Sequence, residues 1–226
     1  MDDTQLSIIE ALQIVTESIK AWVDIQIEDV NEKLSNNSYD KIAITNFSNN
    51  IVIAEIGSVV NTVMFNWSVN KSPVSQRIDG VLVDANSNSY VFNDLNLKSN
   101  KTFTLTVTDE RNVTVSKSTS ITFLNGIYYG VLSSDVEISS EIICNLTRKL
   151  QSSKSTEFTV FANNDEHIVY ALPSKYGIPV FNVDGFNGGF HKKFTIEFTN
   201  SSGYKELYDI WVSDNVGLGQ LTVNVM

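Results

Sequence analysis

Apolar and polar residues alternate strictly along residues 101–125. This period of two places apolar side chains on one face of a β-strand and polar ones on the other. The polar segment 109–112 interrupts the alternation, which then resumes. The pattern predicts a long antiparallel hairpin with a Ser/Thr-rich outer face. Its inward-facing residues are Phe103, Leu105 and Val107, followed by Val113, Val115, Ile121 and Phe123.

The preceding residues supply strands to cover this apolar face. An Asp79-Gly80 pair within 76–83 is a strong signal for a two-residue hairpin turn. Trp67 lies in the most regular of the segments, and no paired cysteines are present to support the core. Short strands at this spacing, without intervening helices, predict an immunoglobulin-like (Ig-like) β-sandwich over 41–126. The expected strands are 42–47, 51–56, 59–69, 76–83 with its turn, and 90–97.

Residues 127–226 predict a second, mostly antiparallel β domain with one helix. The aromatic segment 127–131 is its first strand. Apolar residues at helical spacing predict an amphipathic helix over 134–150, with Ser134 and Glu137 as a capping box. Pairs and triplets rich in Asn and Gly separate the remaining segments. Those segments are 155–161, 167–172, 179–183, 194–200, 206–212 and 221–225.

Residues 4–34 carry the longest helical pattern. Apolar residues recur there at steps of 4, 3, 4, 4, 4, 3 and 4, with no Gly or Pro among them. The helix would be roughly 45 Å long. The three consecutive steps of four residues relax the left-handed supercoil that a strict heptad repeat would impose. We expect self-association through this row, with 1–40 as helix and linker; packing on the β domain is the alternative. The row comprises Ile8, Leu12, Val15, Ile19, Val23, Ile27 and Val30, continuing to Leu34.

Composition narrows the classes of partner. The formal net charge of −10 argues against nucleic acid and against an anionic membrane surface. Cys144 is the only cysteine, so an intrachain disulfide is excluded, and its apolar neighbours predict a buried thiol. The acidic N-terminal stretch lacks the basic region of a signal peptide, and no apolar run reaches the length of a membrane span. We therefore expect synthesis in a cytoplasm without export.

No catalytic, cofactor-binding or metal-binding residue is predicted. His167 and His191 lack metal-ligand spacing, and the Gly-rich stretch 185–189 lacks the Lys-Ser/Thr of a phosphate-binding loop. Carboxylates such as Glu197 and Glu206 are of the residue type that a glycosidase pair requires, but the sequence does not place them at a working separation. No nucleophile motif accompanies them, so we do not expect an enzyme.

Aromatic residues are frequent in the C-terminal half. Most are expected in the core, but three lie in or beside turns: Phe186, Phe190 and Tyr204. These three are the candidates for a recognition platform for a sugar or a protein.

Several segments resemble the Ig-like module of structural proteins from tailed phages of Gram-positive hosts. They are Phe47-Ser48-Asn49, Glu55-Ile56-Gly57-Ser58, Phe65-Asn66-Trp67, Asn70-Lys71, 104–111, 123–125 and 127–131. The stretches 185–190, 202–204 and 217–219 are similar to the C-terminal segment that often accompanies that module. The resemblance covers about residues 42–226 and leaves the N-terminal helix outside.

The resemblance implies a non-enzymatic virion component, assembled in the host cytoplasm as part of a fibre, baseplate or capsid surface. Its expected partners are copies of itself, by analogy with fibres a homotrimer, and other virion proteins. The alternative function is a host-adhesion or carbohydrate-binding module, which uses the C-terminal aromatic residues to bind a surface glycan or protein.

Overall fold

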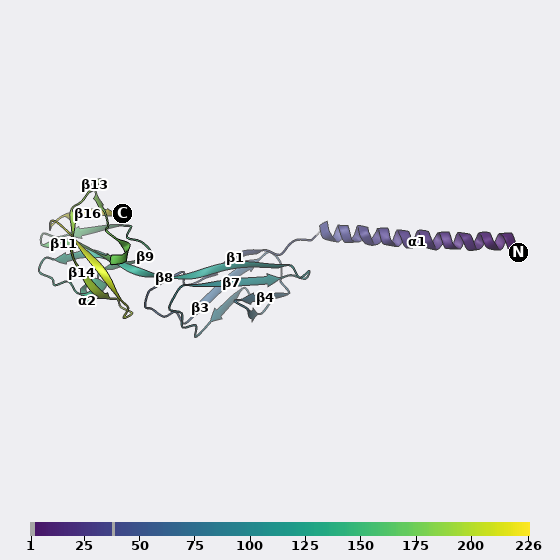
Figure 1. The fold of residues 1–226 in the computed structure, drawn as a ribbon, viewed down its shortest axis with the longest axis horizontal. Coiled ribbons are helices and arrows are strands. Elements are labelled where there is room, and N and C mark those ends of the chain that lie inside the picture. Colours follow the sequence, from purple (N-terminus) through teal and green to yellow (C-terminus); the bar gives the residue numbers. More distant parts are fainter. Residues whose placement is uncertain (1–2, 38) are drawn as a thin grey trace. The chain divides into compact units, whose positions relative to one another are not determined.

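The structure, a computed structural model, describes residues 3–37 and 39–226. The chain divides into two compact units, the first ending at Ala43 and the second spanning Ile44–Met226. Helix α1 (Asp3–Asn37) belongs to the first unit (Figure 1). The predicted long helix is therefore confirmed, and it ends at Asn37, three residues beyond the predicted range of 4–34.

The second unit begins with a β-sandwich of the predicted Ig-like class. One sheet has the order β1-β3-β6, and the facing strands run β8-β7-β4-β5, with β2 pairing in parallel to β8. Both Asp79 and Gly80 have positive φ, 47° and 84°, as the tight turn between β4 and β5 requires. The bounds are β1 Ile44–Asn49, β2 Ile53–Glu55, β3 Val63–Val69, β4 Ser75–Ile78, β5 Val81–Val83, β6 Ser89–Phe92, β7 Lys101–Thr108 and β8 Thr114–Ser133.

Alternation along β7 and β8 produces the predicted two faces. On the inner face Phe103 and Leu105 are buried, and Phe65 of β3 lies 4.7 Å from Phe103 between ring centroids. Trp67 donates its indole N–H to Gln76 Oε1 at 2.9 Å, so its polar atom is satisfied inside the core. On the outer face hydroxyl pairs bridge the two strands: Thr102–Ser120, Thr104–Ser118, Thr106–Ser116 and Thr108–Thr114.

Strand β8 continues well beyond the sandwich. Its 20 residues extend over roughly 65 Å. Its first half pairs with β7 and β2, and its second half pairs with β9 (Thr147–Gln151) and β11 (Glu166–Pro173). The boundary expected between residues 126 and 127 lies inside this strand. One continuous backbone therefore links the two β regions.

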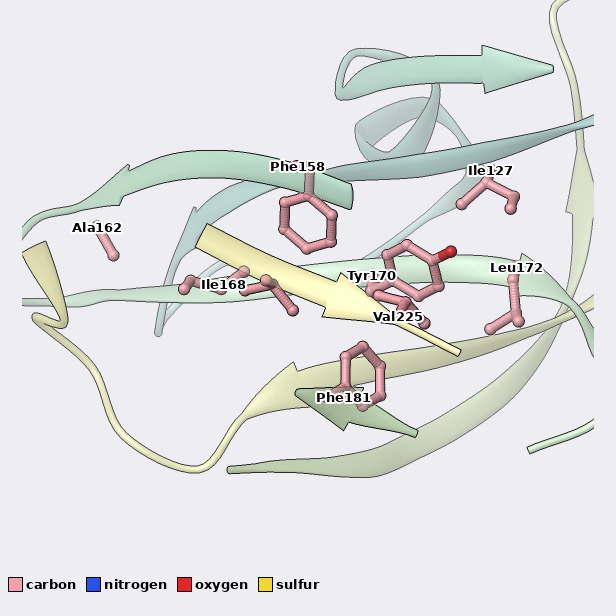
Figure 2. Packing of buried hydrophobic residues seen from close by; sticks show 9 residues of the cluster. Ile127, Phe158, Ala162, Ile168, Tyr170, Leu172, Phe181 and Val225 are labelled. Carbon is pink, nitrogen blue, oxygen red and sulfur yellow. The ribbon is translucent and has the colours of Figure 1, made fainter. Parts of the chain in front are cut away.

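The C-terminal region is built from two sheets and the segment that contains Ile143, which packs on the outer side of the first sheet. The order β14-β15-β11-β8 forms one sheet, and β10-β16-β12-β13 forms the other. Their facing sides enclose an aromatic core around Phe158, Tyr170 and Phe181 (Figure 2). The opposite side of the first sheet carries a second core, which includes Tyr128 and Tyr208. The bounds are β10 Thr156–Ala162, β12 Phe181–Val183, β13 Phe186–Asn187, β14 Phe190–Thr199, β15 Lys205–Ser213 and β16 Gly219–Val225, with a 3₁₀ turn at Ser174–Tyr176.

The prediction of a helix over 134–150 was wrong in the length of the helix. Only α2 (Ser140–Cys144) is helical, and Ser139 instead of Ser134 caps it by accepting from the Ile142 N–H at 3.4 Å. Residues 147–151 form strand β9 because they pair with residues 125–129 of β8. Strand pairing satisfies more backbone groups here than the end of an isolated helix would. Ile143 is still buried against the second core, so the predicted apolar face was partly right.

Candidate interaction surfaces

The first surface is the apolar row of α1. All seven predicted self-association residues have exposed side chains, with exposed fractions between 38% and 60%. Helix α1 is the only regular element within the described residues of the first unit. No second element of that unit buries the row. Scattered apolar residues on a surface are normal, but a contiguous row of this length marks an interaction site.

A second apolar row on α1 was missed by the sequence analysis. Ile14, Trp22 and Ile25 have exposed fractions of 61–65%. Together with Ala11 and the small polar residue Ser18, whose hydroxyl donates to the Ile14 carbonyl, they recur at steps of 3, 4, 4 and 3. At 100° per residue this row lies about a third of a turn from the first. The same period that revealed the first row could have revealed the second, which widens the apolar arc beyond a single seam.

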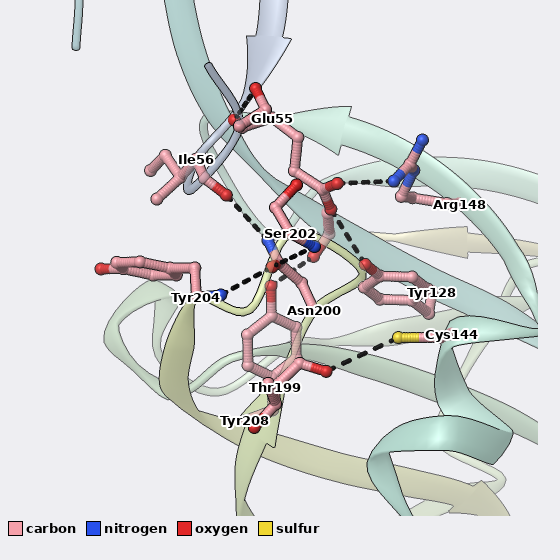
Figure 3. A network of polar contacts seen from close by, with 12 residues as sticks. Glu55, Ile56, Tyr128, Cys144, Arg148, Thr199, Asn200, Ser202, Tyr204 and Tyr208 are labelled. Atoms are coloured by element: carbon pink, nitrogen blue, oxygen red, sulfur yellow. Dashed lines mark hydrogen bonds and ion pairs between the residues drawn. The ribbon is translucent and has the colours of Figure 1, made fainter. Parts of the chain in front are cut away.

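The second feature is the internal junction of the two β regions, where side chains form a network of polar contacts (Figure 3). Glu55, at the end of β2, has an exposed fraction of only 8%. Its carboxylate accepts from Tyr128 Oη at 3.0 Å and from Arg148 at 2.6 Å. Burial, followed by the negative charge of Glu55, raises the pKa of Tyr128, so the phenol stays protonated and donates. Side chains from three distant segments thus meet in one hydrogen-bonded network.

The turn after β14 strengthens the same junction. Asn200 donates to the Ile56 carbonyl at 2.7 Å, while its Oδ1 accepts from the backbone N–H groups of Ser202 and Tyr204, each at 3.0 Å. Gly57 has φ of +91°, and a Cβ placed there would lie 2.4 Å from Tyr204 Cβ. The Cβ end of Tyr204, a predicted recognition residue, therefore packs against Gly57 of the Ig-like region, while the residue remains 37% exposed.

The third surface is a hollow beside β13. It has a volume of about 430 Å³ and includes Phe186 and Phe190 in its lining. Tyr204 lies at the other end of the β14–β15 hairpin, about 30 Å away along the strand. The three predicted recognition residues therefore do not form one platform: two share the hollow and the third belongs to the junction.

The carboxylates considered for glycosidase chemistry are separated by the sheet. Glu206 pairs with Phe198 and Glu197 pairs with Leu207, so consecutive positions place the two carboxylates on opposite faces. Glu206 binds Asn125 and Lys175, and Glu197 binds Lys205. Groups on opposite faces of a sheet cannot flank one scissile bond.

The histidines and the cysteine have local partners. His167 Nδ1 lies 2.9 Å from the Ser213 carbonyl oxygen, and His191 Nδ1 lies 2.6 Å from Asp214 Oδ1. Among residues 3–37 and 39–226, no three His, Cys, Asp or Glu side chains are grouped to hold a metal ion. Cys144 is half-buried, and burial raises the pKa of its thiol, which therefore stays protonated near neutral pH.

Comparison with known proteins finds no matching family model, no similar curated protein and no similar solved structure. Within the described part of the chain, no helix has the length and apolar character needed to cross a membrane. The functional argument therefore depends on the surfaces described above and on the resemblance carried by the sequence segments.

Proposed function

We propose that this chain is a non-enzymatic structural component of a phage virion, part of a fibre, baseplate or capsid surface. It self-associates through α1 and displays the β unit formed by residues 44–226. The observation that carries the proposal is the long row of exposed apolar side chains on a 35-residue helix that forms a unit of its own. The virion assignment itself comes from the family resemblance and is an analogy.

The residues of the two rows favour more than two helices in the bundle. Ile8, Leu12, Val15 and Ile19 alternate at steps of 4, 3 and 4, which are heptad seam positions. These steps place Ile8 and Val15 at d positions and Leu12 and Ile19 at a positions. The d positions therefore carry β-branched residues in place of the Leu that favours two helices, which shifts the preference towards higher oligomers. The second row supports this choice, because each helix of a trimer contacts two neighbours and needs a wider apolar arc than a helix of a dimer. A homotrimer is the state that we propose.

The β unit has the features of a stiff spacer. Strand β8 runs through both β regions, and the Glu55 network joins β2 to β9 beside it. Domain junctions that are small and polar usually permit relative motion. Here a continuous strand restricts that motion, together with an ion pair whose Glu55 side chain is buried and whose Arg148 side chain is 43% exposed. A component that holds other parts of a particle at a fixed spacing requires such stiffness.

Solution mass from light scattering tests the self-association. We expect a trimer for the full chain and a monomer for a chain that starts at Lys41. Trimers from both chains would move the interface into the β unit, and monomers from both would refute assembly through α1. The virion assignment has a separate test: mass spectrometry of purified phage particles from the source strain should detect this chain, and its absence from the particles would refute the assignment.

A second candidate function is host adhesion through a surface glycan. One observation favours it: Phe186 is 80% exposed at the edge of an apolar hollow. Large exposed aromatic side chains beside a concavity are typical of binding sites.

A further inference from the structure

The hollow arises from the way in which β12 and β13 end their sheet. Val183 and Phe186 are paired across the Asp184–Gly185 turn, so both side chains project from the same face. Val183 packs at the margin of the aromatic core, whereas Phe186 is exposed beyond it. Leu218 and Leu221, before and within β16, complete the apolar lining. The hollow is thus an edge of the core that none of the described strands covers.

The floor of the hollow is continuous with the core. Phe190 stacks on Phe181 with 4.2 Å between ring centroids and an interplanar angle of 13°. Phe181 in turn contacts Tyr170 and Trp211. Because these rings are fixed by packing, the floor is preformed and a ligand need not order it on binding.

Polar residues whose side chains have no hydrogen-bond partner in the described part of the chain lie at the rim of the hollow. Asp184 and Asn215 are among the lining residues of the hollow, and their side chains make no hydrogen bond or ion pair within the described residues. Gly188 and Gly189 also line it, with φ of 132° and 75°, and a Cβ at either position would meet nothing within 4 Å. The absence of side chains at these two glycines leaves the backbone open to close approach by a ligand.

We propose that this hollow binds a neutral sugar ring, a hexose or an N-acetylhexosamine. The C–H face of the sugar packs against the exposed ring of Phe186, and its hydroxyl groups hydrogen-bond to the Asp184 carboxylate and the Asn215 amide. A purely apolar side chain from a partner protein fits less well, because it would desolvate the Asp184 carboxylate without replacing its hydrogen bonds. The charge of Asp184 and the net charge of −10 disfavour acidic sugars.

This inference deepens the second candidate function and does not depend on assembly through α1. The test uses the full chain on an array of neutral and acidic glycans, followed by calorimetric titration with the monosaccharides of the neutral glycans that bind. We expect binding to neutral glycans. Phe186→Ala should weaken the affinity about five-fold, which corresponds to the loss of about 1 kcal/mol of contact with the aromatic ring. Asp184→Asn should also weaken it, and the exposure of both residues means that neither change disturbs folding.

Phe161→Ala is the matched control. Phe161 is also a largely exposed phenylalanine, at 61%, and lies on β10 of the same sheet, but it is not part of the hollow. The control should retain wild-type affinity. The proposal would be overturned by an array without neutral-glycan binding, by binding of acidic glycans alone, by binding that Phe186→Ala leaves unchanged, or by equal losses in the two phenylalanine variants. A monomer that binds neutral sugars would remove the structural proposal and retain this one.

Discussion

Glu55 Oε2 lies 2.6 Å from a guanidinium nitrogen of Arg148, although 93 residues separate the two in sequence. The contact joins β2 of the Ig-like region to β9 of the C-terminal region. Because the Glu55 side chain is nearly buried, its charge requires the partners that Arg148 and Tyr128 provide. The junction between the β regions is therefore part of the stability of the whole unit.

Replacing Glu55 should destabilise the β unit. We expect Glu55→Ala to lower the free energy of unfolding by about 2 kcal/mol, because Tyr128 and Arg148 lose their shared acceptor. Denaturant unfolding measures the change. Glu197→Ala is the control, since its ion pair with Lys205 is exposed on both sides and should contribute less than about 1 kcal/mol. Equal losses in the two variants would contradict the structural role of the junction.

Gly57 should not tolerate a side chain. Gly57→Ala places a Cβ 2.4 Å from Tyr204 Cβ and forces a non-glycine residue into positive φ, so we expect a loss of about 3 kcal/mol in the free energy of unfolding. Gly80→Ala is matched in backbone conformation, with φ of +84°, but has open space around it. That control should cost about 1 kcal/mol. If the control were as costly as Gly57→Ala, backbone strain alone would explain the effect.

A charge in the first apolar row should dissociate the assembly. Ile19→Asp buries a carboxylate in the proposed seam, and we expect the solution mass to fall from that of an oligomer to that of a monomer. Gln13→Asp introduces the same charge on the opposite, polar side of α1 and should leave the mass unchanged. Light scattering over a concentration series distinguishes these results. A stable oligomer of Ile19→Asp would place the interface elsewhere.

We expect the ionised Asp209 carboxylate to contribute to the free energy of unfolding, and this contribution to be lost at acid pH. Burial raises its pKa, but hydrogen bonds from Lys192, Ser174 and Thr195 outweigh burial and hold that pKa below its usual value. A carboxyl whose pKa is lower in the folded state stabilises the fold above its unfolded pKa of about 3.9, and this contribution is lost as pH falls through the lower folded value.

Asp209→Asn should therefore reduce the difference between the free energies of unfolding at pH 6 and at pH 3. Asp135→Asn, at an exposed position, should leave that difference close to wild type. An undiminished difference in Asp209→Asn would show that other groups cause the acid response.

Some elements were predictable because their causes are local. The 101–125 hairpin follows from strict alternation, and the Asp79-Gly80 turn follows from two residues that accept positive φ. Helix α1 follows from a helical period without Gly or Pro. Its second row, with Trp22, follows from the same helical period, although the sequence prediction included only the first row.

Other features could not be predicted because they depend on distant partners. Residues 147–151 have a helical apolar pattern but form a strand, since β8 offers them a full set of backbone hydrogen bonds. The continuity of β8 through residue 126 depends on strands that pair with it on both sides. Likewise, Phe186 and Tyr204 both follow Gly in turns, yet one lies at a solvent-exposed hollow and the other packs against Gly57.

The long helix, the alternating strands of the Ig-like region and the tight turns follow from local sequence, because side-chain period and backbone preference act over a few residues. Three other features arise only when distant segments pack together: one strand serves both β regions, Glu55 meets Arg148, and Phe186 remains exposed beside a hollow. These outcomes depend on which segments compete for the same backbone partners and buried surface, and that competition is settled only when the whole chain packs.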